Sequence, residues 1–85
     1  MQSNDLPNGW ALQENELYRK IVFSTFSQAF QFITKVAALA EAMNHHPRWA
    51  QNYTQVEVWL TTHDAANTVT EKDIELAIGI NQLPL

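Results

Sequence analysis

All three histidines of this chain, His45, His46 and His63, lie in one part of the sequence, and acidic residues accompany them. Glu41 shortly precedes the adjacent pair, and Asp64 directly follows the third histidine. Histidine exchanges protons near neutral pH because its unperturbed pKa is about 6.5. Two or three imidazoles around one substrate suit the elimination or addition of water. The sequence therefore predicts a general acid/base site for a small organic molecule.

Two other interpretations of the histidines compete with this one. An imidazolium at a helix C-terminus interacts favourably with the helix dipole, which explains one histidine better than three. A zinc ion would find enough ligands in the three histidines and Asp64. However, His45 and His46 are adjacent and project in different directions, and no His-x-x-x-His spacing places two imidazoles on one helical face. We therefore favour a site without a metal.

The composition gives little support to other catalytic chemistries. The chain has no cysteine, and no serine lies in a strained elbow motif, which argues against nucleophilic catalysis. Only two glycines occur, Gly9 and Gly79, and no glycine-rich phosphate loop is present. We therefore expect neither a nucleotide nor a flavin cofactor.

Length and charge limit the class of protein. With 85 residues we expect a single domain over 1–85, with an N-terminal arm over 1–9. Such a small core is marginal, and without disulfides the common reinforcement is self-association, so we expect an oligomer. The net charge of −4 without a Lys/Arg cluster argues against nucleic acid and anionic membranes as partners. The N-terminus lacks signal-peptide features, so we expect a cytoplasmic location.

The N-terminal part of the sequence predicts two strands. A brief strand is expected over residues 10–12, followed by a polar turn around Asn15. From 17 to 23 the side chains alternate with a period of two, which predicts a strand with one partly solvated face. The side chains on one of its faces are Leu17, Arg19, Ile21 and Phe23.

A long helix is predicted over residues 26–44. Thr25 and Gln28 have the spacing of a capping box, and Pro47 ends the helix because the residue before a proline avoids the α region. Its apolar residues form two rows: Phe26, Phe30, Ile33, Ala37 and Ala40, and Ala29, Phe32, Val36, Leu39 and Met43. One row can cover the sheet, whereas the other would remain an exposed apolar patch, which is typical of an interaction site.

Two further strands follow the histidine pair. They are expected over residues 49–52 and 55–61, around a tight turn at Tyr53-Thr54. The second strand alternates, with Val56, Val58 and Leu60 on one face and Glu57, Trp59 and Thr61 on the other. Residues 63–69 are predicted to form a loop.

A second helix is predicted over residues 71–82. Thr70 caps it, and Asp73 lies in its first turn, where the helix dipole favours an anion. Its predicted buried face consists of Ile74, Ala77 and Ile78. The order of elements predicts an α+β fold, a two-layer sandwich in which helices pack on one face of a four-stranded antiparallel sheet.

The residues around the histidines belong to a longer pattern. It reads Glu41-x-x-Asn44-His45-His46-Pro47-x-Trp49-x-x-x-Tyr53-x-x-Val56-x-Val58-x-Leu60-x-Thr62-His63. This pattern closely resembles the pterin-4a-carbinolamine (4a-hydroxytetrahydrobiopterin) dehydratase family. The likeness extends to Ile21-x-Phe23-x-x-Phe26, to the alanine-rich long helix and to Thr70-x-x-Asp73-Ile74, and it covers nearly the whole chain after residue 9.

The resemblance implies a dehydratase that removes water from 4a-hydroxytetrahydropterin and gives the quinonoid dihydropterin. This reaction recycles the pterin cofactor of aromatic amino acid hydroxylases. The resemblance also implies the sandwich fold, a homodimer or homotetramer assembled through the long helix and sheet edges, and no metal or organic cofactor.

The resemblance also assigns roles to individual residues. The family's catalytic histidines fall on His45, His46 and His63, of which His45 and His63 would transfer protons while His46 orients the ring. The substrate-binding positions fall on Glu41, Asn44, Trp49 and Asp73. Animal members often have an aspartate where Asn44 stands, and the neutral amide can still form hydrogen bonds.

Two other functions fit part of this pattern. A protein-interaction (dimerisation cofactor) module would use the wide apolar face of the long helix, but it would not need three histidines together. An accessory protein in molybdopterin metabolism would keep the pterin site and serve another pathway. The histidine set favours the dehydratase over the first alternative, and genome context would separate the second.

Overall fold

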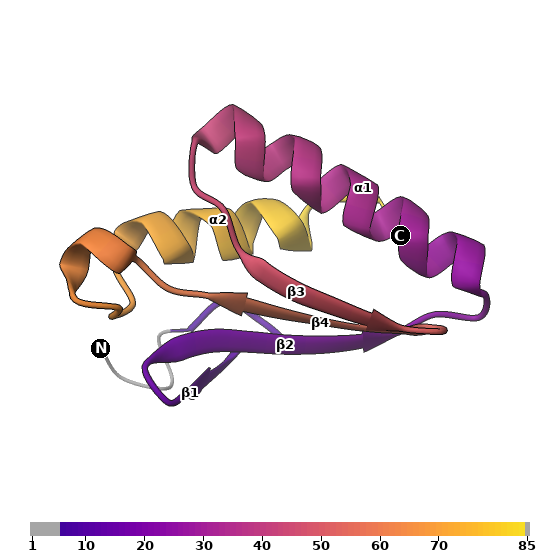
Figure 1. The fold of residues 1–85 in the computed structure, drawn as a ribbon, viewed down its shortest axis with the longest axis horizontal. Helices are drawn as coiled ribbons and strands as arrows, with labels where there is room; N and C mark the ends of the chain where they lie inside the picture. The colour runs from indigo at the N-terminus through magenta and orange to yellow at the C-terminus, as the bar shows by residue number, and fades with distance from the viewer. Residues whose placement is uncertain (1–5, 85) are drawn as a thin grey trace.

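The chain folds into two layers, a four-stranded antiparallel sheet and two α-helices that cover one of its faces (Figure 1). The computed structural model describes residues 6–84. The elements are β1 (Ala11–Gln13), β2 (Glu16–Val22), α1 (Phe26–Met43), β3 (Arg48–Asn52), β4 (Gln55–Leu60), a short 3-10 helix (His63–Ala65) and α2 (Glu71–Asn81). The predicted α+β sandwich is confirmed, and each predicted strand and α-helix lies within one residue of the observed bounds.

The strand order β1-β2-β4-β3 places β4 in the interior of the sheet. All three neighbouring pairs are antiparallel, and Leu17 of β2 lies opposite Leu60 of β4. Glu14 and Asn15 join β1 to β2 with φ angles of 50° and 66°, as tight hairpin turns require. β4 lies between β2 and β3 in the sheet. The connection that contains α1 therefore passes over one face of the sheet to link β2 with the edge strand β3 (Figure 1).

The start of α1 agrees with the predicted capping residues, with one difference. Thr25 Oγ1 accepts a hydrogen bond from the backbone N–H of Gln28 at 3.1 Å. The Gln28 side chain in turn accepts from the backbone N–H of Ser24 at 3.1 Å, one residue earlier than in a capping box. The Gln28 N–H is one of the donors at a helix start that have no intrahelical partner.

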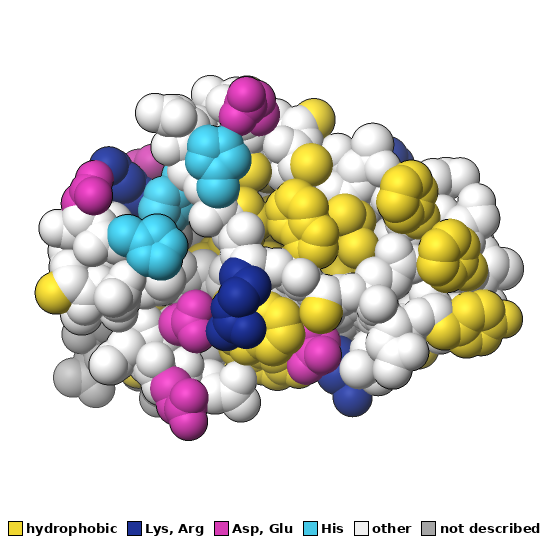
Figure 2. Space-filling model, viewed as in Figure 1, with side chains coloured by type: hydrophobic (Ala, Val, Ile, Leu, Met, Phe, Trp, Pro, Cys, Tyr) yellow, Lys and Arg dark blue, Asp and Glu magenta, His cyan; other side chains and the backbone are white. Residues whose placement is uncertain are grey.

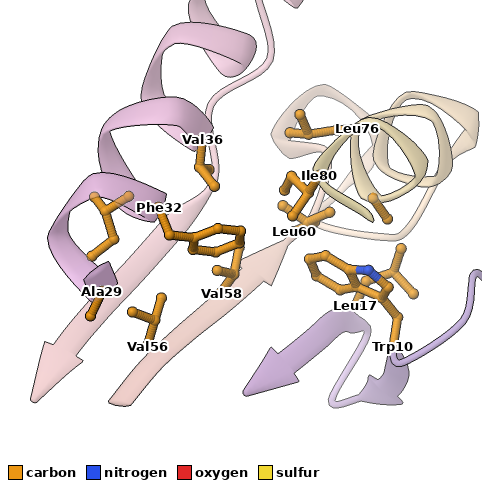
Figure 3. Packing of buried hydrophobic residues seen from close by; sticks show 12 residues of the cluster. Trp10, Leu17, Ala29, Phe32, Val36, Val56, Val58, Leu60, Leu76 and Ile80 are labelled. Atoms are coloured by element: carbon orange, nitrogen blue, oxygen red, sulfur yellow. The ribbon is translucent and has the colours of Figure 1, made fainter. Parts of the chain in front are cut away.

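The hydrophobic core fills the space between the sheet and the helices (Figure 3). The buried residues of α1 are Ala29, Phe32, Ile33, Val36 and Ala40. Phe26 and Phe30, at the start of the first predicted row, are 52% and 55% exposed, and their rings are nearly parallel with centroids 6.3 Å apart. The bare apolar surface of α1 therefore lies at its N-terminal turns.

The buried face of α2 differs from the prediction. The buried residues of this helix are Asp73, Leu76, Ala77 and Ile80. Ile78 is 45% exposed, and Ile74 is partly buried. Positions 73, 76, 77 and 80 form one helical stripe, and a charged residue within that stripe is unusual in a core. The placement of Ile78 in the core was therefore wrong, because the stripe that includes Asp73 faces the interior.

The opposite face of the sheet carries polar and aromatic side chains. The guanidinium of Arg48 lies 4.1 Å from the centre of the Trp59 ring. Tyr18 donates a hydrogen bond to Glu57 at 2.7 Å, which raises the pKa of Tyr18 because the bond favours the neutral phenol. This face is partly solvated, as the alternation of β2 and β4 predicts.

Residues 1–5 of the predicted N-terminal arm lie outside the described residues. In the described part that follows, Trp10 Nε1–H donates to the side-chain oxygen of Asn81 at 3.0 Å, and the Asn81 amide donates to the carbonyl of Asn8 at 2.9 Å. These bonds tie the chain before β1 to the end of α2. Among residues 6–84, no helix is long and apolar enough to cross a membrane.

Replacing Phe32 tests the core. Its side chain is 2% exposed, so Phe32→Ala should lower the free energy of unfolding by about 3–5 kcal/mol. The neighbouring Gln31 is exposed, and Gln31→Ala should change it by no more than about 0.5 kcal/mol. Urea unfolding followed by circular dichroism measures both variants, and equal losses would contradict this assignment of the buried face.

Candidate active site

The adjacent histidines lie where α1 ends. Asn44 takes a left-handed conformation with a φ of 52°, and the backbone N–H of His45 donates back to the carbonyl of Ala40 at 3.0 Å. A left-handed residue of this kind commonly terminates a helix, and Pro47 prevents its continuation. The chain turns sharply here, so the side chains of His45 and His46 reach different partners.

His45 is held by a buried carboxylate. Its Nε2 lies 2.6 Å from Oδ1 of Asp73, whose side chain is fully buried. The other oxygen, Oδ2, accepts from the Thr62 hydroxyl at 2.7 Å and from the backbone N–H of Thr70 at 2.8 Å. A carboxylate only accepts hydrogen bonds, so His45 donates through Nε2 and keeps Nδ1 free as the acceptor of the neutral ring.

His46 pairs with Glu41 at the surface. Its Nε2 lies 2.8 Å from Oε1 of Glu41, and the two side chains are 61% and 79% exposed. Exposed pairs of this kind contribute little to stability, because water screens the attraction and both side chains remain mobile. His46 and Glu41 are therefore free to rearrange around a ligand.

His63 reaches the same region from the segment that follows β4. It begins the short 3-10 helix after β4, and its Nδ1 lies 2.6 Å from the side-chain oxygen of Asn67. Both side chains are exposed. The predicted loop over 63–69 thus contains an ordered turn, closed by a bridge between Thr62 and Thr68.

A polar cleft of about 310 Å³ joins these segments. Its lining residues are Asn44, His45, His46, Thr61, Thr62, His63, Asp64 and Lys72. Figure 2 shows the three histidine side chains gathered on one face of the molecule. The structure therefore brings together all three predicted catalytic histidines and Asn44, which come from the end of α1 and the end of β4.

Three predicted site residues do not line this cleft. Asp73 lies behind His45 and is buried, whereas Glu41 is exposed and touches the site through His46. Trp49 is 39% exposed on edge strand β3, opposite Val58 and thus on the side of the sheet that carries the helices. A ligand would have to extend from the cleft toward β3 to contact it.

Thr62 and Lys72 are cleft residues that no motif assigned to substrate. Thr62 is 6% exposed and continues the inward-facing positions of Val56, Val58 and Leu60. The sequence does contain a signal for Thr62, namely a polar residue at an inward-facing position of an alternating strand. Lys72 gave no such signal, since a lysine beside a helix start is ordinarily a solvated surface residue.

Among residues 6–84, no group of three or more His, Asp or Glu side chains is arranged to hold a metal ion. The described histidine contacts go instead to carboxylate or amide oxygens. Such contacts orient imidazoles and select their protonated nitrogen. The arrangement can donate and accept protons around a small polar molecule.

This fold and site define a small α+β protein with a polar cleft lined by three histidines, and comparison with known proteins identifies the family. The model of the family described as Pterin 4 alpha carbinolamine dehydratase matches residues 1–83. The chain belongs to this family.

The sequences of two relatives are similar to this chain over most of its length. A protein of Prochlorococcus marinus (strain MIT 9313), named "Putative pterin-4-alpha-carbinolamine dehydratase", is 49% identical over 88% of this chain and 77% of its own. A protein of the same name from Synechococcus sp. (strain WH7803) is 46% identical over 95% of this chain and 85% of its own.

Two solved structures share the fold. A transcriptional coactivator/pterin dehydratase from Brucella melitensis superposes with a TM-score of 0.81 at 39% identity, over 87% of this chain and 80% of that one. A pterin dehydratase-like protein identified as a RuBisCO assembly factor in the alpha-carboxysome gives 0.73 at 22% identity, over 87% of each chain. The second likeness concerns the fold alone.

The buried carboxylate can be tested by stability. Asp73→Ala would remove the buried acceptor of Thr62, Thr70 and His45, although the Thr62 hydroxyl would keep its 2.7 Å contact with the Thr70 hydroxyl. Because hydrogen bonds to a charged group contribute about 1.5–3 kcal/mol, the free energy of unfolding should fall by at least about 1.5 kcal/mol. Glu71→Ala, at an exposed position of the same first turn, should cost about 0.3–1 kcal/mol through the helix dipole. Thermal and urea unfolding measure the two variants. A loss at Asp73 no larger than at Glu71 would contradict the hydrogen bonds described for it.

Proposed function

We propose that this protein is a 4a-hydroxytetrahydropterin dehydratase, a hydro-lyase that works by histidine acid/base catalysis without a metal or organic cofactor. The observation that carries the proposal is the meeting of His45, His46 and His63 at one polar cleft, although they come from two separate segments. Membership of the dehydratase family supports the same reaction.

The reaction needs two proton transfers. One group protonates the 4a-hydroxyl so that it leaves as water, and another removes the proton from ring nitrogen N5. The C–O bond breaks, a C=N bond forms between C4a and N5, and the product is the quinonoid dihydropterin. Correctly placed imidazoles can serve both steps near neutral pH.

The proposed division of roles follows the family resemblance. His45 and His63 transfer the protons, and each has one ring nitrogen held by a protein oxygen, as His46 also has. His46 orients the pterin together with Glu41. Asp73 acts on His45 as a positioning residue, since its oxygens are occupied by protein donors.

Asn44 and Trp49 would bind the pterin at its two sides. Asn44 lines the cleft and offers an amide to the polar edge of the ring system. Trp49 offers a flat apolar surface on β3 to a pterin that reaches beyond the cleft. In this function the protein would recycle the pterin cofactor of an aromatic amino acid hydroxylase in the cytoplasm.

The proposal includes self-association into a homodimer or homotetramer. Phe26 and Phe30 on α1 and Tyr53 at the β3–β4 turn are at least half exposed, at 52%, 55% and 70%. Figure 2 shows hydrophobic side chains continuing along this side of the molecule. Exposed aromatic groups on a small domain favour burial against a second copy. The edge strand β3 ends next to Tyr53, and its Gln51 side chain donates to the backbone carbonyl of Phe26 at 3.4 Å.

The dehydratase function is tested by stopped-flow absorbance with 4a-hydroxytetrahydropterin. The wild-type protein should accelerate dehydration, and His63→Ala should lose about 10²–10⁴-fold of the rate, the contribution typical of a proton-transferring imidazole. Lys20→Ala, on the other face of the sheet, should keep the wild-type rate. No acceleration by the wild-type protein would refute the proposal and favour a non-catalytic interaction module or another pterin pathway.

The assembly is tested by placing a charge on the exposed aromatic pair. Phe30→Glu should increase the elution volume in size-exclusion chromatography because a carboxylate would have to be desolvated in the contact. Gln31→Glu adds the same carboxylate at an exposed position about 100° around α1 from Phe30 and serves as the matched control. An oligomer that survives Phe30→Glu unchanged would exclude this face from the contact.

A further inference from the structure

Asn67 lies beside His63, although no motif or periodicity pointed to it. Its side-chain oxygen is 2.6 Å from Nδ1 of His63. An amide oxygen only accepts hydrogen bonds, so Nδ1 must carry the proton and donate. In a neutral imidazole only one nitrogen is protonated, which leaves Nε2 of His63 as the acceptor.

The loop after β4 is folded so that Asn67 returns to His63. The backbone N–H of Asn67 donates to the carbonyl of Thr62 at 3.1 Å, and that of Thr62 donates to the carbonyl of Thr68 at 3.0 Å. Ala66 and Asn67 both have a φ of 58°, in the left-handed region. Asparagine is among the few residues enriched in this conformation, which makes it both a turn residue and a hydrogen-bond acceptor here.

The two histidines proposed to transfer protons are therefore hydrogen-bonded through different ring nitrogens. His45 donates through Nε2 to Asp73, and His63 donates through Nδ1 to Asn67. Among residues 6–84, Nδ1 of His45 and Nε2 of His63 have no hydrogen-bond partner. Only the partner of His45 is charged and buried, and the partner of His63 is a neutral, exposed amide.

We propose that Asn67 is a positioning residue for His63, which fixes the Nδ1-protonated tautomer and directs Nε2 to the substrate. Its importance for dehydration rests on the function proposed above. The tautomer itself is a property of the free protein and can be measured without any substrate.

The test uses two glycine variants in the same loop. Asn67→Gly keeps the left-handed backbone accessible but removes the amide, and Ala66→Gly relaxes the backbone without touching the amide. Long-range ¹H–¹⁵N correlation spectra of the imidazole ring, recorded where His63 is neutral, report which nitrogen carries the proton. Steady-state kinetics then separates kcat from KM.

In the wild-type protein, Nδ1 should carry the proton of His63. Asn67→Gly should lower the ratio of the Nδ1–H to the Nε2–H form roughly two- to tenfold, as expected for the loss of one hydrogen bond, with a comparable fall in kcat at similar KM. Ala66→Gly should leave the tautomer and kcat unchanged. Asn67→Asp should restore the Nδ1–H form because its carboxylate is again an acceptor.

An unchanged His63 tautomer in Asn67→Gly, or a wild-type ring protonated on Nε2, would overturn the inference. Equal effects of the two glycine variants on kcat would also overturn it, because they would show a general dependence on loop structure. If the tautomer shifts as expected in a protein that does not accelerate dehydration, the proposed function fails and the assigned hydrogen bond stands.

Discussion

The buried carboxylate of Asp73 is the interaction on which the arrangement of the cleft depends. It receives hydrogen bonds from Thr62 after β4, from Thr70 before α2 and from His45 after α1. A buried charge is very costly unless its oxygens are satisfied, so the three segments must converge for the fold to be stable. The described buried side-chain polar atoms all have partners. Stability and the orientation of His45 are therefore consequences of the same contacts.

The cleft combines rigid and adaptable groups. His45 has a side chain only 13% exposed and a charged partner, whereas the pair of His46 and Glu41 is largely in water. Hydrogen bonds shielded from water are stronger than exposed ones, so the three imidazoles should differ in mobility. One fixed imidazole can define the position of a ligand, and exposed ones can adjust as the ligand binds and leaves.

The two sides of α1 differ in how far they are buried. Phe32 and Val36 pack on the sheet, and Phe26 and Phe30 remain in solvent. Both rows have helical spacing, so the sequence indicated a helix with two apolar rows but could not say which members would be covered. Ile33 and Ala40 of the first row are buried, whereas Phe26 and Phe30 are not. That outcome depends on the crossing of α1 over β4, which is a long-range property of the sheet order. The same limit explains the error at Ile78, whose spacing within α2 was compatible with burial.

The sequence by itself determined the element order, the α+β sandwich and the grouping of the histidines near the ends of elements, because periodicity, capping residues and Pro47 act over a few residues. It also marked Asp73 as an acidic residue at a helix start. Only the tertiary structure decided that Asp73 lies behind His45, that Trp49 lies outside the cleft and that Asn67 holds His63. These relations join residues through turns and packed layers, and hydrogen bonds of that kind depend on three-dimensional distances that local sequence patterns do not encode.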